Sequence, residues 1–289
     1  MSRRKIKILG CYVDVCDFYQ TTKKITDILN TRQKHTKYGV TPNSEILLAC
    51  RFDIKLKKII NQANISTADG AGLLWAAKYN SLPLTKIPIL REIQAFFQLI
   101  VSSIIFAFKP SYAKIIPERV TGTDLVPEIA KICAEHKKSL FLLGAGPGVA
   151  QKTALRLQSI NSKLQIAGTS GQDHHSKHDR TIIETINKSK ADCLLIAYGA
   201  PRDQYWIARN KDKLTTVRFV LGVGGAFDFI TEETSILGGR KAVRAPLWMR
   251  NWHLEWLHRL YYQPDRIGRI INAVFYFPLL VMVEKIYSK

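Results

Sequence analysis

Glycine and basic residues cluster in the last quarter of the chain. The stretch Gly222-Val-Gly-Gly-Ala-Phe-Asp228 is rich in glycine, and Arg240-Lys-Ala-Val-Arg244 follows it closely. Glycine lets the main chain approach a ligand, and a guanidinium group can bind two phosphate oxygens at once. This pattern predicts a diphosphate site. Its candidate binding residues are Gly222, Gly224, Gly225, Asp228 and Arg244.

Two further glycine turns have the composition of phosphate-binding loops. Gly144-Ala-Gly-Pro-Gly148 ends an apolar run and opens a helical pattern, where main-chain N–H groups and the helix dipole favour phosphate. Val149 replaces the third glycine of a dinucleotide fingerprint, which argues against a nicotinamide or flavin cofactor. A tight strand-to-helix turn explains these glycines equally well. The second turn is Gly199-Ala-Pro201, which closes a later strand. Candidate substrate contacts at and just after the two turns are Gly144, Gly146, Gly148, Gly199, Pro201 and Gln204.

Polar side chains follow two predicted strands in the first 70 residues. Asp69 comes directly after Ile65–Ala68, and its carboxylate could accept a proton from a substrate hydroxyl. Asp69 could equally act as the N-cap of the following helix. Thr41 and Asn43 lie at the end of another strand, where they could contact a substrate or simply form a turn.

A histidine-rich loop has the residue types of a metal site. Asp173, His174, His175 and His178 lie close together in the sequence. No matching cluster elsewhere completes a ligand set, and the loop is polar, so we predict that the protein binds no metal.

The charge balance favours anionic partners. Lys and Arg number 43 against 23 Asp and Glu, a formal charge of +20. The basic residues are interleaved with the glycine turns along most of the chain, so we expect no nucleic-acid partner. Five cysteines without paired spacing indicate a reducing compartment. The N-terminal segment is too short and polar for a signal-peptide core, so we expect a cytoplasmic protein.

Apolar strand patterns alternate with helical patterns, which predicts a parallel sheet covered by helices on both faces. The predicted strands are Lys5–Leu9, Tyr38–Thr41, Ile65–Ala68, Leu140–Leu143, Gln165–Gly168, Asp192–Ala197 and Phe219–Val223. The predicted helices include 21–31, 44–60, 71–79, 149–160 and 181–188, with another from Arg202. Ligands of such sheets bind beyond the carboxyl ends of the strands, where the candidate residues lie.

The C-terminal segment combines tryptophan with arginine. Trp248, Trp252 and Trp256 recur at helical spacing between basic residues. These amphipathic side chains suit the headgroup level of a membrane, although such a row more usually packs in a core. We predict a core of residues 1–239 and a membrane-proximal appendage of residues 240–289.

Two apolar runs approach the length of a membrane span. Ile93–Phe108 and Ile270–Val283 hold 16 and 14 uncharged residues, short of the roughly 20 that a span needs. The first belongs to an apolar insertion at about 82–116 and carries a polar stripe, so it could lie in a membrane interface or be a core helix with a solvated edge. For the second we predict an interfacial position. The protein is therefore expected to be peripheral on the inner face of the plasma membrane.

Taken in order, the motifs resemble the WecG/TagA/CpsF family of bacterial glycosyltransferases. The matching residues are Val40-Thr-Pro-Asn43, Thr67-Ala-Asp-Gly70, Glu118-Arg-Val-Thr-Gly-Thr-Asp124, Leu142-Leu-Gly-Ala-Gly-Pro-Gly148, Tyr198-Gly-Ala-Pro-Arg202 with Trp206, Gly222 to Asp228, and Arg244-Ala-Pro246 through Glu255-Trp256, Arg259-Leu260, Pro264 and Arg266. The resemblance covers nearly the whole chain except the insertion.

The resemblance implies a metal-independent, inverting transferase with a Rossmann-like sheet. Such an enzyme moves a sugar, for example N-acetylmannosamine, from UDP to a polyprenyl-diphosphate-linked acceptor in cell-surface polysaccharide or teichoic acid assembly. It implies that Asp69 is the general base, that Thr41 lies nearby, and that the appendage closes over the site. Arg244, Glu255, Arg259 and Arg266 are the appendage residues expected to bind substrate. No cofactor is expected, and a homo-oligomer is left open.

Two features depart from the family pattern. Asp203 stands where the family usually has an amide, so a contact to the donor is expected to differ. The apolar insertion is unusual and leaves the mode of membrane contact open. A nucleotide-dependent oxidoreductase would share the sheet, but it should carry the complete fingerprint that this chain lacks.

Overall fold

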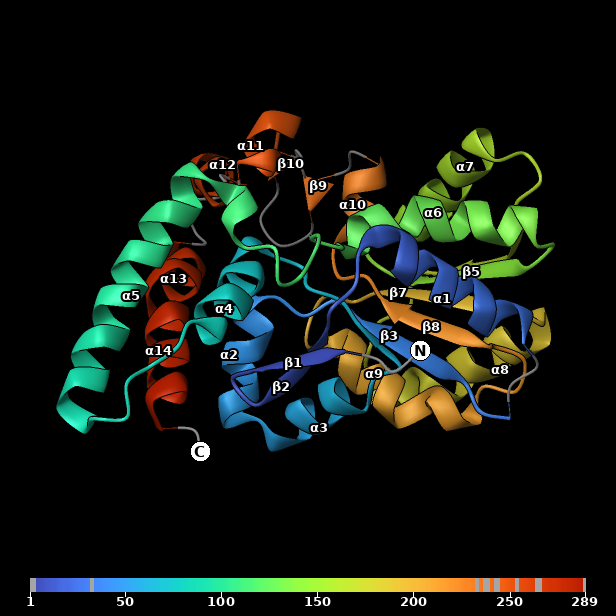
Figure 1. The fold of residues 1–289 in the computed structure, drawn as a ribbon. Helices are drawn as coiled ribbons and strands as arrows, with labels where there is room; N and C mark the ends of the chain where they lie inside the picture. The colour runs from blue at the N-terminus through green and yellow to red at the C-terminus, as the bar shows by residue number, and fades with distance from the viewer. Residues whose placement is uncertain are drawn as a thin grey trace.

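A six-stranded parallel sheet forms the centre of the molecule. The computed structural model describes residues 4–31, 34–231, 234–235, 240–241, 245–252, 255–262 and 267–287. The strand order is β4-β3-β8-β7-β5-β6 (Figure 1). The strands are β3 (Lys37–Val40), β4 (Ile65–Ser66), β5 (Ser139–Gly144), β6 (Gln165–Ser170), β7 (Cys193–Ala197) and β8 (Phe219–Gly222). The predicted α/β class with a Rossmann-like sheet is confirmed.

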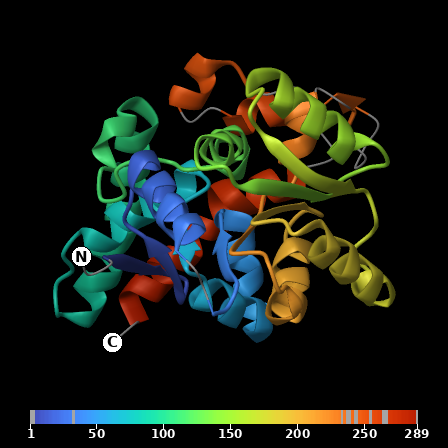
Figure 2. The same cartoon turned by 90° about the vertical axis from the view of Figure 1, so that its right-hand side faces the viewer.

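Helices cover both faces of this sheet, as Figure 2 shows in the view along its edge. One core contains side chains from α1 (Phe18–Asn30), α6 (Gly122–Glu135), α7 (Val149–Ile160) and α10 (Ala226–Thr231). The other contains side chains from α2 (Ser44–Phe52), α3 (Ile54–Gln62), α4 (Ala71–Ser81), α8 (Asp179–Ser189) and α9 (Arg202–Asn210). All five residues of β7 are buried, because successive side chains enter opposite cores. A strand buried on both faces reads as a continuous apolar run, which is why the sequence revealed it.

The first predicted strand does not belong to the parallel sheet. β1 (Lys5–Ile8) pairs antiparallel with β2 (Cys11–Asp14) in a separate hairpin. Leu9 and Gly10 connect the strands, and both have positive φ (48° and 74°), as a two-residue hairpin turn requires. The strand itself was predicted correctly, but the prediction that it belongs to the parallel sheet was wrong.

The helix predicted over residues 44–60 is two helices. α2 ends and α3 begins at Asp53, which serves as the C-cap of the first and the N-cap of the second. Its Oδ1 accepts a hydrogen bond from the main-chain N–H of Leu56 at 2.8 Å. The capping carboxylate therefore ends one helix and starts the next inside an apolar pattern whose helical periodicity showed no break.

Two long apolar helices lie at one end of the molecule. α5 (Pro88–Phe108) is 21 residues long, and the C-terminal run of α13 (Ile267–Ile271), a π-helical turn (Asn272–Tyr276) and α14 (Phe277–Tyr287) also spans 21. Both are long and apolar enough to cross a membrane, so the expectation that these segments fall short of that length was wrong. The helix lengths were underestimated because each helix continues beyond a charged residue at the end of its uncharged run.

Short elements complete the described chain. They are 3-10 turns at Pro110–Tyr112, Ser176–His178 and Lys211–Lys213, the strand pair β9 (Thr234–Ser235) and β10 (Arg240–Lys241), and helices α11 (Leu247–Asn251) and α12 (Glu255–Tyr262). The domain boundary predicted at residue 239 lies outside the described residues and stays a prediction.

Candidate active site

The topology creates a ligand-binding crevice between β5 and β7. The chain leaves β5 through α7 on one face of the sheet, and it leaves β7 through α9 on the other face. Neighbouring parallel strands whose connections diverge in this way form the crevice where open α/β sheets bind ligands. The loops at this point are Gly144–Gly148 and Tyr198–Pro201, two of the turns singled out from the sequence.

The Gly144–Gly148 turn is built in conformations that suit glycine. Gly144 has a φ of 95° and Gly148 a φ of 77°. A Cβ atom on Gly144 would lie 2.8 Å from the ring of Tyr198, so the two loops approach as closely as glycine allows. α7 starts directly after Gly148 without a side-chain cap. The N–H groups of its first turn therefore have no side-chain acceptor at this N-cap, which is the arrangement that binds anions at helix N-termini.

Asp203 fastens the β7 loop to the β8 loop. Its Oδ1 accepts the N–H of Tyr198 at 2.7 Å, and its Oδ2 accepts the N–H of Gly224 at 2.9 Å. The side chain is 1% exposed, and this burial raises the pKa of Asp203 to about 7 against the lowering effect of the N–H donors. The carboxylate was expected to change a contact to the donor. In the structure it binds main chain, because a short acid reaches two N–H groups on adjoining turns.

The third residue of α9, next to Asp203, is also enclosed. Gln204 is 2% exposed, and its Oε1 has no hydrogen-bond partner. Gly222, at the end of β8, packs so closely on Asp203 that an added Cβ would lie 2.7 Å from the Cβ of Asp203. The first turn of α9 therefore packs directly against the end of β8, and only a glycine at position 222 leaves room for it.

Asp69 and Thr41 come together at the ends of β4 and β3. The N–H of Asp69 donates to the carbonyl of Pro42 at 2.9 Å, which joins the two loops. Asp69 is partly exposed and Thr41 is 8% exposed. Gly70, not Asp69, occupies the N-cap position of α4. The prediction that Asp69 could be that N-cap is therefore wrong, and the residue lies at the same edge of the sheet as the glycine turns.

Asn43 has a structural task at this edge. It is the N-cap of α2, and its Oδ1 accepts the N–H of Ile46 at 3.0 Å. Asn43 therefore has a local structural role, as a helix N-cap rather than in the turn that the sequence suggested, and a contact of its side chain with substrate stays a prediction.

A loop that the site prediction omitted joins Asp69 to the β8 turn. The N–H of Val120 donates to the carbonyl of Ala68 at 3.0 Å, and a Cβ on Gly122 would lie 3.2 Å from the Cα of Val223. Thr121 caps α6 through the N–H of Asp124 at 3.1 Å. The Thr-x-x-Asp spacing of this capping pair is the signal that could have placed a helix N-terminus here.

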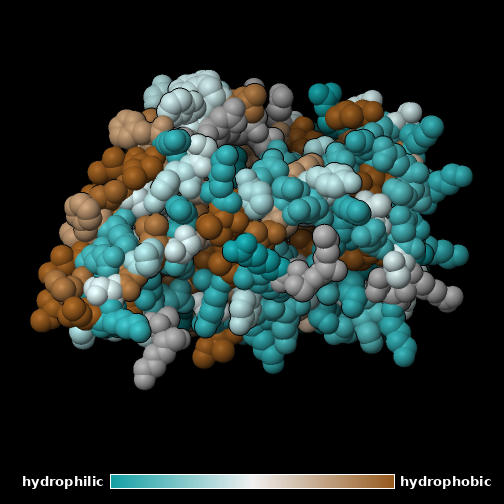
Figure 3. Space-filling view, in the orientation of Figure 1, coloured by the Kyte–Doolittle hydropathy of each residue, from teal (hydrophilic) through white to brown (hydrophobic). Residues whose placement is uncertain are grey.

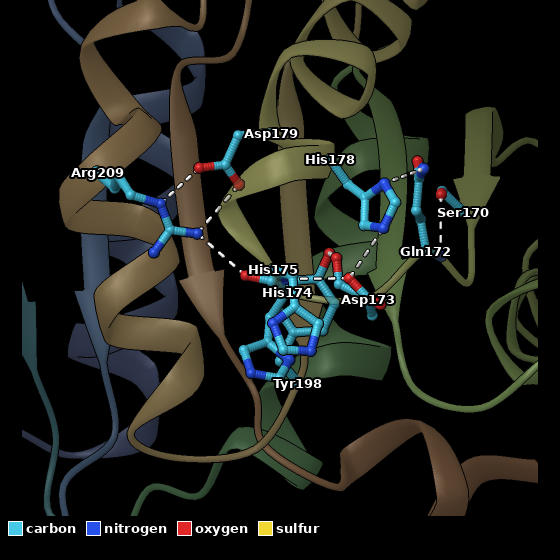
Figure 4. A network of polar contacts seen from close by, with 9 residues as sticks. All are labelled: Ser170, Gln172, Asp173, His174, His175, His178, Asp179, Tyr198 and Arg209. Carbon is cyan, nitrogen blue, oxygen red and sulfur yellow. Dashed lines mark hydrogen bonds and ion pairs between the residues drawn. The ribbon is translucent and has the colours of Figure 1, made fainter.

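The histidine-rich loop after β6 forms a polar network, not a ligand cage (Figure 4). Asp173 accepts the N–H of His175 at 3.0 Å and lies 3.6 Å from Nε2 of His178. His174 packs between the rings of His175 and Tyr198. Within the described residues, no group of three or more His, Cys, Asp or Glu side chains is placed to hold a metal ion. The prediction that the protein needs no metal is not tested by this arrangement.

An ion pair between the buried Asp179 and the more exposed Arg209 anchors the same loop to α9. Arg209 Nε donates to Asp179 Oδ2 at 2.5 Å, and Arg209 Nη2 donates to the carbonyl of His174 at 3.1 Å. Burial opposes ionisation of Asp179, but hydrogen bonds from Arg209 and Asn210 together with nearby positive charge outweigh it and lower the pKa of that carboxyl. Burial, followed by the charge of Arg202, lowers the pKa of His174. A Cβ on Gly171 would lie 3.4 Å from the carbonyl oxygen of Gly146, so this histidine-rich loop lies directly beside the Gly144–Gly148 turn.

The appendage residues are placed only in part. Arg244 and Arg266 lie outside the described residues, and Glu255 and Arg259 are located only as positions on α12. Trp248 and Trp252 are 60% and 52% exposed, so for these two the core interpretation of the tryptophan row is wrong. Their roles in binding, like that of Asp228 on α10, stay predictions.

A parallel α/β sheet with glycine turns where the crossover connections diverge is typical of enzymes that bind nucleotides. The profile of the family described as glycosyl transferase WecG/TagA/CpsF matches residues 6–106 and 95–289. The chain belongs to this family and is a glycosyltransferase. The oxidoreductase alternative is not favoured.

Curated relatives carry a more specific name. They include proteins named N-acetylglucosaminyldiphosphoundecaprenol N-acetyl-beta-D-mannosaminyltransferase from Staphylococcus aureus strains MRSA252 and NCTC 8325 / PS 47. Each is 24% identical to this chain over 266 residues, which cover 92% of this chain and 88% of the relative.

Proposed function

We propose that this protein transfers an N-acetylhexosamine, such as N-acetylmannosamine, from a UDP-sugar to a polyprenyl-diphosphate-linked acceptor in cell-surface polysaccharide or teichoic acid assembly. The observation that carries the proposal is the convergence of Asp69 and three glycine turns on one edge of the sheet in a chain of this family. The names of the relatives supply the sugar and the acceptor class.

The strand order suggests how the donor lies. From β7 to β4 the edge spans three strand spacings, about 14 Å at the usual separation. A nucleotide sugar is elongated, with the diphosphate between nucleoside and sugar. We place the nucleoside near the β5–β7 crevice, the diphosphate along the Gly144–Gly148 and Gly222–Gly225 turns, and the sugar toward Asp69.

Asp69 then acts as the general base. Its carboxylate takes the proton of the acceptor hydroxyl as the oxygen attacks the anomeric carbon, on the face opposite the leaving diphosphate. A base in this position contributes about 10²–10⁴-fold. The departing UDP gains negative charge, which the N–H groups of the glycine turns and the arginines Arg244 and Arg259 stabilise in place of a metal.

The acceptor carries a polyprenyl chain, so the enzyme works where that chain resides. We propose a peripheral protein on the inner face of the plasma membrane, held there through the appendage of residues 240–289. The exposed tryptophans 248 and 252 and the net charge of +20 support contact with anionic headgroups.

The test is direct. The purified full chain is incubated with a panel of UDP-sugars and a short-chain N-acetylglucosaminyl diphospholipid, and the products are identified by mass spectrometry, with and without EDTA. We expect one N-acetylhexosamine to be added, and the activity to survive EDTA. Absence of transfer from every UDP-sugar, together with thermal stabilisation by NAD, would refute the proposal.

A further inference from the structure

The outer face of α5 is apolar along its whole length. Seven large side chains recur there at helical spacing, and each is at least 40% exposed: Ile89, Ile93, Phe96, Phe97, Ile100, Ile104 and Phe108. Figure 3 shows the corresponding band of hydrophobic residues at that end of the molecule. Soluble proteins rarely leave so long a continuous apolar surface in water, and such a surface marks an interaction site.

The inner face of α5 is fixed to the body of the enzyme. Ala95 and Ser102 are 0% and 1% exposed. The hydroxyl of Tyr79 donates to the carbonyl of Ala95 at 2.9 Å, and Nε1 of Trp75 donates to Oγ of Ser102 at 3.1 Å. If α5 left α4 to cross a bilayer, these buried polar groups would lose their partners. α5 therefore lies along the domain and does not cross the membrane.

The C-terminal helical run has the same two-sided construction. Its exposed apolar residues recur every fourth position: Ile267, Ile271, Phe275, Leu279, Val283 and Tyr287. On its inner side Phe277 and Val281 are fully buried. The π-helical turn joins α13 to α14, and the exposed row continues across it. The two helices therefore expose a single apolar face along the whole run.

Polar contacts bind this run to both α4 and α5. Nζ of Lys285 donates to the carbonyl of Tyr79 at 2.7 Å and to Oε1 of Gln98 at 2.9 Å. The hydroxyl of Tyr287 donates to Oε1 of Glu92 at 3.0 Å. Two segments separated by more than 150 residues in the sequence thus form one surface, drawn side by side in Figure 1.

We propose that the exposed rows of α5 and α13–α14, here called the apolar platform, embed in one leaflet of an anionic phospholipid bilayer with both helix axes in the membrane plane. Each helix is about 31 Å long at 1.5 Å per residue, so the platform contacts lipid over a long strip. Lys86 and Lys109, both exposed, flank α5 and can reach the headgroups.

The positive charge of the protein favours an anionic lipid surface, rather than a second copy of the chain, as the partner of the apolar platform. Two copies joined through the platform would bring together proteins of formal charge +20 each, whereas an anionic leaflet is complementary. This inference rests on the peripheral membrane location proposed above and adds α5 to the contact made by the C-terminal segment. The surface requires no acceptor and no appendage arginine, so its lipid binding can be tested separately from the transfer reaction.

The test uses flotation of the full chain with vesicles of equimolar phosphatidylcholine and phosphatidylglycerol that contain no acceptor. The test variant is Ile93→Gln with Phe97→Gln, at positions 62% and 66% exposed on α5. The control variant is Leu155→Gln with Ile160→Gln, both 62% exposed on α7. Far-ultraviolet circular dichroism and thermal unfolding establish that each variant is folded.

We expect the wild type and the control to float and to stay bound in high salt, because the contact is apolar. The test variant should partition roughly 100-fold less, since two large apolar side chains no longer enter the lipid. Binding that salt abolishes and that the α5 variant leaves unchanged would overturn the proposal in favour of headgroup adsorption. A wild-type dimer in ultracentrifugation that the α5 variant dissociates, without vesicle binding, would overturn it in favour of a second copy.

Discussion

Asp203 offers a quantitative test of the geometry at the glycine turns. Asp203→Asn keeps the size of the side chain but removes its ionisation and one of its two acceptor oxygens. Either the N–H of Tyr198 or that of Gly224 then loses its partner, at a cost of about 1–3 kcal/mol that does not vary with pH. The pH-dependent part of the difference comes from the carboxyl pKa alone.

The sign follows from the direction of the shift. Burial raises the pKa of Asp203 from 3.8 to about 7 in the folded protein, so between these values the folded state binds more protons than the unfolded state. The wild type therefore loses stability as the pH rises through this window, and the loss is complete above the folded pKa. Between about pH 5 and pH 8 the loss amounts to about 3 kcal/mol. The Asn variant has no such term.

Urea unfolding at several pH values measures this difference, with Trp206, fully buried on the same helix, among the fluorescent reporters. The stability of Asp203→Asn relative to the wild type should rise by about 3 kcal/mol from pH 5 to pH 8. Asp212→Asn, at a carboxylate whose side chain is 65% exposed, controls for the loss of one negative charge. A difference that stays constant over this range would refute the reasoning, because it would mean that the main-chain donors fully offset burial.

Three other perturbations test the site. Asp69→Asn should lower turnover roughly 10²-fold or more while UDP still binds in a thermal-shift assay; near-normal turnover would contradict its role as the base. Gly222→Ala should cost about 1–3 kcal/mol in urea unfolding, because its Cβ would meet that of Asp203 at 2.7 Å, and unchanged stability would disprove the close packing. Arg209→Met should cost about 2 kcal/mol near neutral pH, discounted because Arg209 is 35% exposed. Arg209 lowers the pKa of Asp179, so this cost should shrink as the pH falls and the carboxyl is protonated; a gap that widens in acid would contradict it.

The sequence predicted the parallel strands because their burial on both faces leaves a clear apolar pattern. It also predicted that the candidate turns lie at one edge of the sheet, since each follows a strand and parallel strands end at the same edge, whereas their contacts with substrate stay predictions. The break at Asp53 was missed because a single capping carboxylate interrupts a helix without changing its periodicity. The β1–β2 turn at Leu9-Gly10 was missed because the first of its two positive-φ residues is not one that favours such a turn.

Contacts between distant segments had no local signal. Asp203 looked like a ligand contact, and only the spatial meeting of the β7 and β8 loops makes it a main-chain anchor. The pairing of α5 with α14 is likewise invisible in either segment alone, because each is apolar on most of its surface. Which face is buried depends on contacts such as those of Lys285 with Tyr79 and Gln98, which are 206 and 187 residues away in the chain.

The apolar platform and the candidate base are connected through rigid packing. α4 begins two residues after Asp69, and a Cβ on its Gly72 would lie 3.5 Å from the ring of Phe277 on the inner side of α14. Arg269, at the start of the same run, lies 3.4 Å from Glu45 in the first turn of α2. The diphosphate of a lipid-linked acceptor is confined to a narrow range of depth at the membrane surface. A platform packed directly against the helix that follows Asp69 fixes the distance from leaflet to base, which a flexible tether could not do.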